Sequence, residues 1–267
     1  MQKILLFLLI IEHLYAGFEE TGNDARRAGL ANARATVSGD VWSVFHNVSG
    51  LAYLEKMQVG LTATPGLYNL NELKSCAIAF GIPTSAGVFG SFIKKYGFSL
   101  YSEMSLGIAY ACSLGNLTLG SELLYQNVSI ARYGSAKTYS INLGLLGKIT
   151  SNLIVGMYVH NLNNPDLGRY DEPLPLIIGS GLTVIPTNDF YFYLDVEKRQ
   201  NFSPEIAYAI EYLILKNVGL RFGVRTESIH YGGGLTFRSG AIQCDYAITV
   251  HRVLGVSHFL TLTFFKI

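Results

Sequence analysis

The residues of this sequence that could do chemistry are charged side chains set an even number of residues apart. Arg221 and Arg225, for example, share one parity of the segment 217–227, and the other parity is apolar. Since successive side chains of a β-strand point to opposite faces, such a segment has one charged and one apolar face. Charges of both signs gathered on one face can pair with each other or meet water. The candidates for this shared polar face are Glu103, Glu122, Lys148, Asp195, Glu197, Glu205, Glu211, Arg221, Arg225, Glu227, Arg238 and Asp245.

The sequence carries no motif for catalysis or metal binding. It has no G-x-S-x-G elbow, no H-E-x-x-H, no C-x-x-C pair and no G-x-x-x-x-G-K loop. Its 6 histidines are scattered. Its 3 cysteines, Cys76, Cys112 and Cys244, are widely spaced and do not support a disulfide framework. We therefore expect no catalytic residue, no metal, no cofactor and no enzyme activity; a hydrolase would need a serine with a nearby base, and no such pair stands out.

Two interpretations of the polar face stay open. The first is a solvated or salt-bridged interior that keeps the strands in register. The second is a polar conduit or ligand cavity, in which Tyr158, Tyr191 and Tyr193 would also take part. The run Gly232-Gly233-Gly234 lies inside a strand pattern, where it indicates a bend or a close backbone approach in preference to a nucleotide loop.

Alternation continues along most of the chain from about residue 58. The segments have the length that a tilted membrane strand needs, about 9 to 11 residues. They number about fourteen, and an even number of strands is usual in bacterial outer-membrane barrels. We predict strands at 58–65, 73–82, 86–96, 101–112, 116–127, 138–149, 152–161, 174–184, 188–199, 204–214, 217–227, 229–238, 241–250 and 256–266.

The predicted connections alternate in length. Tight turns such as 83–85 and 113–115 interleave with longer links at 65–72, 128–137 and 162–173. Short periplasmic turns and longer external loops are typical of outer-membrane barrels.

The composition agrees with an exported membrane barrel. The chain is 49% hydrophobic and 15% charged, with a mean hydropathy of +0.29. No run reaches the roughly 18 to 20 apolar residues of a membrane-spanning helix. Lys3, the apolar run 4–11 and the small residue Ala16 predict a signal peptide over residues 1–16. The net charge is +1 and no basic block occurs, which argues against nucleic acid as a partner.

A soluble sandwich would also show alternation, with its apolar face turned inward. The strand lengths, the hydrophobicity, the signal peptide and the terminal strand HFLTLTFFKI favour the membrane barrel. We therefore predict an all-β protein, an antiparallel transmembrane barrel of the outer membrane at residues 58–267.

Residues 17–57 lack the alternation of apolar and polar residues and are not expected to form a membrane strand. Small residues alternate there with Arg26, Arg27 and Arg34, which predicts a short helix or coil with a basic side. Asp40 precedes the aromatic pair Trp42 and Phe45 and is expected to cap a helical turn.

The run ARRAGLANARATVSGDVWSVFHNVSGLAYLEKMQVGL resembles the N-terminal signature of PorV-type (PorV/PorQ) and related FadL-type outer-membrane proteins. In that signature a small-residue segment leads to an acidic residue, an aromatic pair and an Asn-Pro-Ala-Gly-Leu turn before the first strand. Val48 and Ser49 stand here where the signature has Pro and Ala. The matching positions are Ala25, Arg26, Gly29, Asp40, Trp42, Phe45, Asn47, Gly50, Leu51 and Ala52.

The resemblance implies a fourteen-stranded barrel whose N-terminal segment folds into the lumen as a plug. It also implies two functional precedents. FadL-type members pass long-chain hydrophobic molecules through a gap in the barrel wall, and PorV-type members carry cargo proteins in type IX secretion. This chain is short for either group, so we expect trimmed external loops.

We therefore expect a barrel that acts in transport or in secretion-associated binding. Its expected partners are outer-membrane lipid and either a hydrophobic small molecule or secreted proteins and secretion components. A structural or assembly barrel that passes nothing is the alternative. For the plug we expect Arg26, Arg27 and Arg34 to face lumenal carboxylates such as Glu122, Asp195 and Glu211, because a lumen screens charge less than bulk water does.

Overall fold

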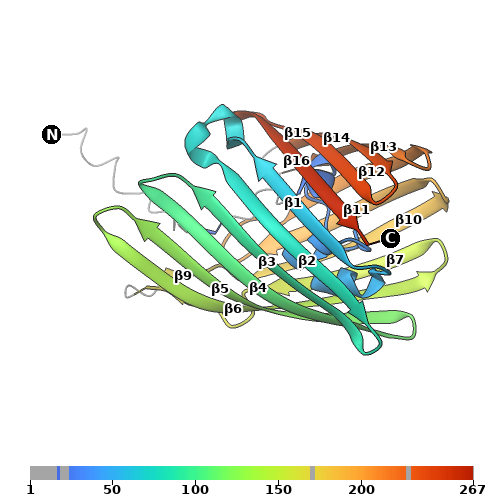
Figure 1. The fold of residues 1–267 in the computed structure, drawn as a ribbon, viewed down its shortest axis with the longest axis horizontal. Helices are drawn as coiled ribbons and strands as arrows, with labels where there is room; N and C mark the ends of the chain where they lie inside the picture. The colour runs from blue at the N-terminus through green and yellow to red at the C-terminus, as the bar shows by residue number, and fades with distance from the viewer. Residues whose placement is uncertain (1–16, 19–23, 169–171, 227–229, 267) are drawn as a thin grey trace.

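Fourteen strands close into one antiparallel barrel in the computed structural model, which describes residues 17–18, 24–168, 172–226 and 230–266 (Figure 1). Each barrel strand pairs with the next along the chain, and β1 pairs with β16 to close the ring. The predicted all-β antiparallel barrel is therefore confirmed. Its strands are β1 (Gln58–Thr64), β2 (Ser75–Thr84), β3 (Gly87–Gly97), β4 (Tyr101–Leu114), β5 (Leu117–Ile130), β6 (Gly134–Thr150), β7 (Leu153–His160), β10 (Ile177–Thr187), β11 (Phe190–Arg199), β12 (Glu205–Leu215), β13 (Val218–Arg225), β14 (His230–Ser239), β15 (Ile242–His251) and β16 (Gly255–Phe265).

The two parities of each strand face opposite sides of the wall. In β12, Ile210 is exposed on the outer face, while Ala209 and Glu211 are buried on the inner face. An outer face of large apolar side chains suits lipid, and a closed barrel leaves no strand edge to be satisfied there. Among the described residues, no helix has the length and apolar character needed to cross a membrane. Further exposed apolar residues of the outer face are Ile78, Phe89, Ile108, Leu123, Phe222 and Ile248.

The two ends of the barrel differ in the length of their connections, as the sequence predicts. At one end, which we call the short-turn end, each connection has two residues: 85–86, 115–116, 151–152, 188–189, 216–217 and 240–241. The other end, the long-loop end, carries the connections 65–74, 98–100, 131–133, 161–176, 200–204 and 252–254. Two of these contain short elements, η3 (Leu67–Asn69) with η4 (Asn71–Leu73), and the small sheet of β8 (Asp166–Leu167) with β9 (Glu172–Pro173).

The predicted link 128–137 is wrong in length. β5 continues to Ile130 and β6 begins at Gly134, so the connection is 131–133 alone. The ladder continues through Ser129 and Ser135, which are directly paired and exposed. Both faces of the hairpin are largely exposed at this height, so the alternation that marks the other strands is lost while the backbone pairing persists.

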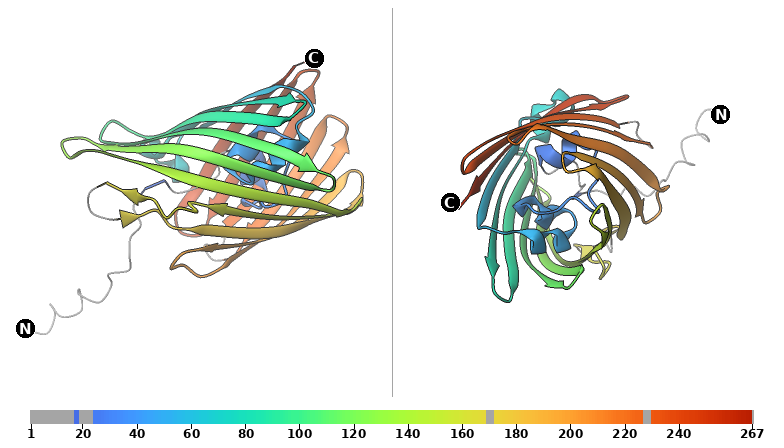
Figure 2. Two further views of the ribbon diagram at one scale, coloured as in Figure 1. Left: turned by 90° about the horizontal axis from the view of Figure 1, so that it is seen from below. Right: turned by 90° about the vertical axis from the view of Figure 1, so that its right-hand side faces the viewer.

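Residues 24–57, which we call the plug, fold inside the barrel (Figure 2). Their elements are α1 (Ala25–Gly29), η1 (Val41–Phe45) and η2 (Val48–Tyr53). Apolar plug side chains pack on opposite parts of the inner wall: Phe45 lies in one cluster with Phe92 of β3, and Leu30 lies in another with Tyr193 of β11. The predicted signal peptide 1–16 and residues 19–23 of the predicted plug lie outside the described residues.

Short polar contacts define the plug elements. Asp24 caps α1, because its Oδ1 accepts a hydrogen bond from the backbone N–H of Arg27 at 3.1 Å. Asn47 caps η2 in the same way through the N–H of Ser49. The expected cap at Asp40 is wrong: Asp40 holds the N-cap position of η1 without a side-chain cap bond, and its carboxylate binds plug arginines instead.

Glycines of the wall make room for the plug. A Cβ at Gly232 of β14 would lie 2.8 Å from the backbone nitrogen of Ala31, and one at Gly120 of β5 would lie 2.5 Å from that of Ser49. No side chain fits at such distances, so these positions require glycine. The expectation that the Gly232 stretch marks a close backbone approach is thereby confirmed.

Candidate functional site

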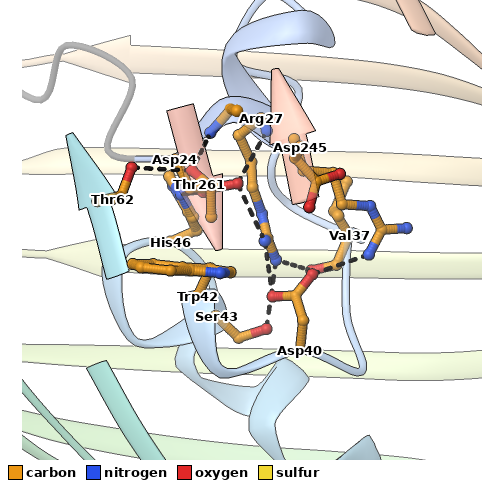
Figure 3. Close-up of polar contacts among 12 residues, drawn as sticks. Asp24, Arg27, Val37, Asp40, Trp42, Ser43, His46, Thr62, Asp245 and Thr261 are labelled. Atoms are coloured by element: carbon orange, nitrogen blue, oxygen red, sulfur yellow. Dashed lines mark hydrogen bonds and ion pairs between the residues drawn. The ribbon is translucent and has the colours of Figure 1, made fainter. Parts of the chain in front are cut away.

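The plug arginines divide between the wall and the plug itself. Arg26 spans both, since its Nη2 lies 2.8 Å from Oε2 of Glu211 on β12 and its Nη1 lies 2.8 Å from Oδ2 of Asp40. Arg27 stays within the plug: its Nη1 lies 2.6 Å from Oδ1 of Asp40 and 3.6 Å from Oδ1 of Asp24 (Figure 3). The expectation that all three plug arginines face wall carboxylates is therefore wrong for Arg27.

Arg34 joins the plug to β11 through backbone and side chain. Its guanidinium pairs with Glu197, and Nε lies 3.0 Å from Oε2 of that carboxylate. The backbone N–H groups of Arg34 and Ala35 both donate to Oδ2 of Asp195, at 2.5 and 2.6 Å. Asp195 thus accepts hydrogen bonds from the plug backbone. Glu197, the next residue on the same face of β11, forms the ion pair with the Arg34 guanidinium.

The wall supplies its own arginines to the same carboxylates. Arg221 of β13 lies between Glu211 and Asp245, with nitrogen to oxygen distances of 2.6 and 2.8 Å. Arg225 lies 3.0 Å from Oε1 of Glu197 and also pairs with Glu205. Buried charges of both signs therefore join the plug to the wall in two separate groups, as in the salt-bridged interpretation of the polar face. The first group comprises Arg26, Glu211, Arg221 and Asp245, and the second comprises Arg34, Glu197, Arg225 and Glu205.

Asp24 also forms a hydrogen bond with a histidine of the plug. Nε2 of His46 lies 2.8 Å from Oδ2 of Asp24, and both side chains are buried (Figure 3). Burial lowers the pKa of His46 from its usual 6.5 to about 4, more than the hydrogen bond to Asp24 raises it. Burial alone would raise the pKa of Asp24, but Arg27 and His46 lower it well below its usual value. At neutral pH the pair is therefore a neutral imidazole that donates to a carboxylate.

Trp42, the only tryptophan of the chain, anchors η1 to the wall. Its indole Nε1 donates to Oγ1 of Thr263 on β16 at 3.0 Å. The ring stacks on Phe45 with centroids 6.1 Å apart, and Phe45 in turn lies 4.1 Å from the ring of Phe92. A row of three aromatic rings therefore crosses from the plug to β3.

The remaining residues of the N-terminal signature hold the plug backbone. Nδ2 of Asn47 lies 2.6 Å from the carbonyl oxygen of Ala35 and within 3.2 Å of the carbonyls of Leu145 and Met157. Gly29 lies against the backbone of Gly234, Gly50 lies against Ser43, and Leu51 is fully buried beside Gly90. These contacts are structural, and they account for the residue types without assigning them a ligand.

A cavity of about 80 Å³ lies between η1 and the long-loop end. Val44 and Phe45 of η1 line it on the plug side, and Glu103 and Glu122 line it from β4 and β5. The expected contact of Glu122 with a plug arginine is wrong, since its Oε2 accepts from Nδ2 of Asn142 at 2.8 Å. Glu122 thus bonds to Asn142, while Arg199, which pairs with Glu197, also lines this cavity.

Two other predicted lumenal residues lie near the short-turn end of the barrel. The ammonium of Lys148 lies 4.4 Å from the ring centroid of Tyr53 on the plug, and Arg238 lies over the ring of Phe265. Glu227 lies outside the described residues. The three cysteines are unpaired, and the described residues contain no group of His, Cys, Asp or Glu that could hold a metal ion.

Sequence reasoning missed several residues that hold the plug. Asp24 and His46 are not among the predicted site residues, although an aspartate directly before a helix is a cap signal. Thr36 and Thr183, whose hydroxyl oxygens lie 2.6 Å apart, carry no recognisable signal at all.

No family model and no curated protein matches this sequence. Solved structures do match it. CymD, a monoaromatic hydrocarbon channel, has a TM-score of 0.70 at 13% identity, over 94% of this chain and 99% of that chain. The barrel is FadL-like. The Ralstonia pickettii toluene transporter TbuX has a TM-score of 0.69 at 12% identity, over 92% and 98%. A Pseudomonas aeruginosa FadL homologue has a TM-score of 0.63 at 11% identity, over 93% and 99%, so the FadL-like fold extends over nearly the whole chain.

Proposed function

We propose that this chain is an outer-membrane channel that admits small hydrophobic molecules when its plug shifts. The observation that carries the proposal is a FadL-like barrel whose lumen holds a segment of its own chain, bound by ion pairs, hydrogen bonds and apolar contacts. A lumen filled in this way blocks passage, so transport requires the plug to move. CymD and TbuX are described as a channel and a transporter for monoaromatic compounds, which supports the same class of cargo here.

The proposal includes the bacterial outer membrane as the location. The apolar outer face of the barrel supports it, since such a face is stable only against lipid. The signal peptide that the sequence predicts at residues 1–16 would bring the chain out of the cytoplasm. The predicted domain division, with a plug before residue 58 and a barrel after it, belongs to the same proposal.

Thr36 of the plug and Thr183 of β10 provide the test. Their hydroxyl oxygens lie 2.6 Å apart, so two cysteines at these positions are close enough for a disulfide. The background chain would carry alanine at Cys76, Cys112 and Cys244. In vesicles with lipopolysaccharide in the outer leaflet, oxidised Thr36→Cys/Thr183→Cys should reduce the initial rate of toluene uptake to that of vesicles without protein, and reduction should restore it.

A second cysteine pair serves as the matched control. Thr62 of β1 and Thr261 of β16 have hydroxyl oxygens 2.8 Å apart, but both belong to the wall. Thr261 also accepts from the backbone N–H of Ala25 at 2.9 Å, so the reference for this control is its own reduced form. Oxidised Thr62→Cys/Thr261→Cys leaves the plug untied and should keep the uptake rate of that reduced form. Equal uptake by the oxidised and reduced forms of the plug-to-wall pair would contradict a channel that opens by plug movement.

A role in type IX secretion is a second proposal, and it rests on the resemblance of residues 25–61 to the PorV-type signature. Several connections at the long-loop end are only three residues long, which leaves little external surface for a cargo protein. A pulldown from detergent that returned secretion components in stoichiometric amounts, together with no solute uptake, would favour this role or a purely structural one over the channel.

A further inference from the structure

The outer face of β3 to β6 changes from apolar to polar toward the long-loop end. The last apolar row across these four strands consists of the outward-facing, cross-strand neighbours Ile93, Leu106, Tyr125 and Tyr139. The ring centroids of Tyr125 and Tyr139 are 5.5 Å apart, and tyrosines at the edge of an apolar belt are typical of the membrane–water interface. The next row toward the long-loop end, which we call the lysine row, consists of Lys95, Met104, Asn127 and Lys137. The lysine row should therefore lie at the height of the lipid head groups.

The two lysines of this row give the outer face a positive charge. Both side chains are exposed, and neither forms an ion pair with any residue that the structure describes. Glu103 and Glu122 are the only carboxylates of β3 to β6, four strands that are described throughout, and both are buried on the inner face. Lysines beside a lipid surface attract anionic head groups, so these two charges are available to an anionic lipid.

Hydrogen-bonding groups accompany the lysines. Asn127 lies between them, and its Oδ1 has no hydrogen-bond partner in the described part of the chain. The row beyond, toward the long-loop end, presents the hydroxyl groups of Ser102, Ser129 and Ser135. Three interstrand spacings separate Lys95 from Lys137, so their Cα atoms lie roughly 14 Å apart. This surface therefore combines two cations at its ends with uncharged donors and acceptors between and beyond them.

The apolar belt is hollowed over the same four strands. A hollow of about 390 Å³ is lined by outward-facing side chains of β3 to β6, namely Phe89, Ile108, Tyr110, Ser121, Leu123 and Ile141. Ser121 is the smallest of them, and it precedes Asn127 on β5 by about 20 Å along the strand. An acyl chain that descends from a head group at the lysine row would reach this hollow.

We propose that the outer face of β3 to β6 binds a phosphorylated glycolipid, the lipid A part of lipopolysaccharide. The head group of such a lipid consists of two linked sugars with a phosphate at each end. Lys95 and Lys137 each bind one phosphate, Asn127 and the serine hydroxyls bind the sugar hydroxyls, and one acyl chain lies in the hollow at Ser121. This inference rests on the outer-membrane location of the proposed function, but it does not depend on plug movement or on the cargo.

An anionic phospholipid is the competing occupant of this surface. The lysines would attract it too, but its single phosphate cannot pair with two lysines whose Cα atoms are roughly 14 Å apart. Each lysine at a lipid surface strengthens the binding of anionic lipid by about fivefold. A lipid with two phosphates should therefore bind at least about fivefold more tightly than a lipid with one.

Native mass spectrometry measures this difference. The chain, refolded in a non-ionic detergent so that it carries no bacterial lipid, would be mixed with diphosphoryl lipid A, monophosphoryl lipid A or phosphatidylglycerol. The fraction of barrel with bound lipid gives an apparent Kd for each probe. We expect diphosphoryl lipid A to bind at least about fivefold more tightly than monophosphoryl lipid A, and phosphatidylglycerol to bind most weakly.

Variants of exposed residues locate the site. Lys95→Gln/Lys137→Gln should weaken the binding of diphosphoryl lipid A by about 25-fold and abolish the difference between the two lipid A forms, because both charges are lost. Lys216→Gln/Lys266→Gln is the matched control, since it removes two exposed lysines at the short-turn end and should keep the native affinities. Ser121→Phe keeps both lysines but fills the hollow, so it should weaken both lipid A forms by the same factor. A heat-modifiability gel checks that each variant forms the closed barrel.

The other outcomes each overturn a defined statement. Equal affinity for lipid A and phosphatidylglycerol would overturn the glycolipid in favour of any anionic lipid. Native affinity for diphosphoryl lipid A in Lys95→Gln/Lys137→Gln would overturn the site, and an equal loss in Lys216→Gln/Lys266→Gln would reduce the effect to net charge. Unchanged binding in Ser121→Phe would overturn the placement of the acyl chain. All of these results leave plug-gated uptake standing, because the disulfide experiment tests it separately.

Discussion

The carboxylate of Glu197 forms ion pairs with one arginine of the plug and one arginine of the wall. Arg34 of the plug and Arg225 of the wall both pair with it, and the Tyr158 hydroxyl donates to its Oε2 at 2.6 Å. A buried carboxylate is stable only while such partners compensate the loss of hydration, and the arginines depend on it in turn. Loss of this one charge therefore affects the plug and the wall together.

Glu197→Gln should lower the stability of the folded barrel substantially. Breaking a buried ion pair from one side typically costs about 3 to 5 kcal/mol, because the partner charge stays buried. The thermal midpoint of folded barrel, followed by Trp42 emission, should fall accordingly. Glu55→Gln is the control, since Glu55 belongs to the plug but is exposed. Equal midpoints for the two variants would contradict a structural role for the Glu197 pairs.

Residue identities on the polar face could be predicted, but their partners could not. Parity assigns Glu197, Glu211 and Arg221 to the lumen, because strand geometry fixes the face of each residue. Which arginine meets which carboxylate depends on the path of the plug, and a segment with little regular structure has no periodicity to reveal that path. For this reason Arg27 turned out to bind Asp40 of the plug, and Glu122 to bind Asn142.

His46 predicts how the stability depends on pH. Its pKa is lowered to about 4 in the folded chain, so between pH 6.5 and 4 the unfolded chain binds a proton that the folded chain does not. Its contribution to stability is thus complete above pH 6.5 and is lost as the pH falls toward 4, a change of roughly 3 kcal/mol. The thermal midpoint, followed by Trp42 emission, should fall as the pH is lowered over this range, and His46→Gln should reduce that fall. An unchanged slope in His46→Gln would assign the pH dependence to other groups.

At the scale of the elements, glycines at inward-facing strand positions leave the space that the plug occupies. A Cβ at each of eight such positions would meet a plug atom within 3.0 Å, because the plug backbone or a plug side chain lies directly against the strand. A strand gains nothing from glycine by itself, so the pattern indicates close approach. The positions are Gly60, Gly81, Gly90, Gly120, Gly144, Gly156, Gly223 and Gly232.

Two adjacent glycines of β14 test this account. Gly232 faces the plug backbone, whereas Gly233 faces an apolar hollow of the outer wall and a Cβ there would meet nothing within 4 Å. Gly232→Ala should destabilise the barrel by about 1 to 3 kcal/mol. Gly233→Ala should be neutral or stabilising by roughly 0.5 to 1 kcal/mol, because alanine suits a strand better than glycine does. Thermal midpoints of the two variants measure the difference, and equal effects would mean that the plug does not press on this strand.

The barrel strands could be predicted from the sequence, but one connection and two short strands could not. Alternation located every barrel strand, because the apolar parity must face outward and the polar parity inward along the whole wall. It failed between residues 128 and 137, where β5 continues to Ile130 and β6 begins at Gly134 although residues 129–135 are exposed or half-buried on both faces. It also carried no information on β8 and β9, whose two residues each are too few for a period.

At the scale of the whole molecule, the fold consists of a closed wall and a plug that the wall does not need for closure. The ring closes through β1 and β16, and every pairing in it is between barrel strands. The plug is attached by its side chains, by backbone N–H groups that donate to wall side chains, and by the chain at Met57–Gln58. None of these bonds belongs to the strand ladder, so the plug can rearrange without opening a strand edge to lipid. A channel gated from inside its own lumen requires this independence of wall and plug.

The unequal ends of the barrel predict its orientation in the membrane. Two-residue turns are typical of the periplasmic end, so the long-loop end should face the outside. Tyr133, 89% exposed in the connection 131–133, and Lys216, exposed in the turn 216–217, mark the two ends. With the native cysteines replaced by alanine, a membrane-impermeant maleimide should label Tyr133→Cys on intact cells. Lys216→Cys should react only after the outer membrane is permeabilised. Labelling of Lys216→Cys on intact cells would reverse the orientation, and the cavity of Glu103 and Glu122 would then open toward the periplasm.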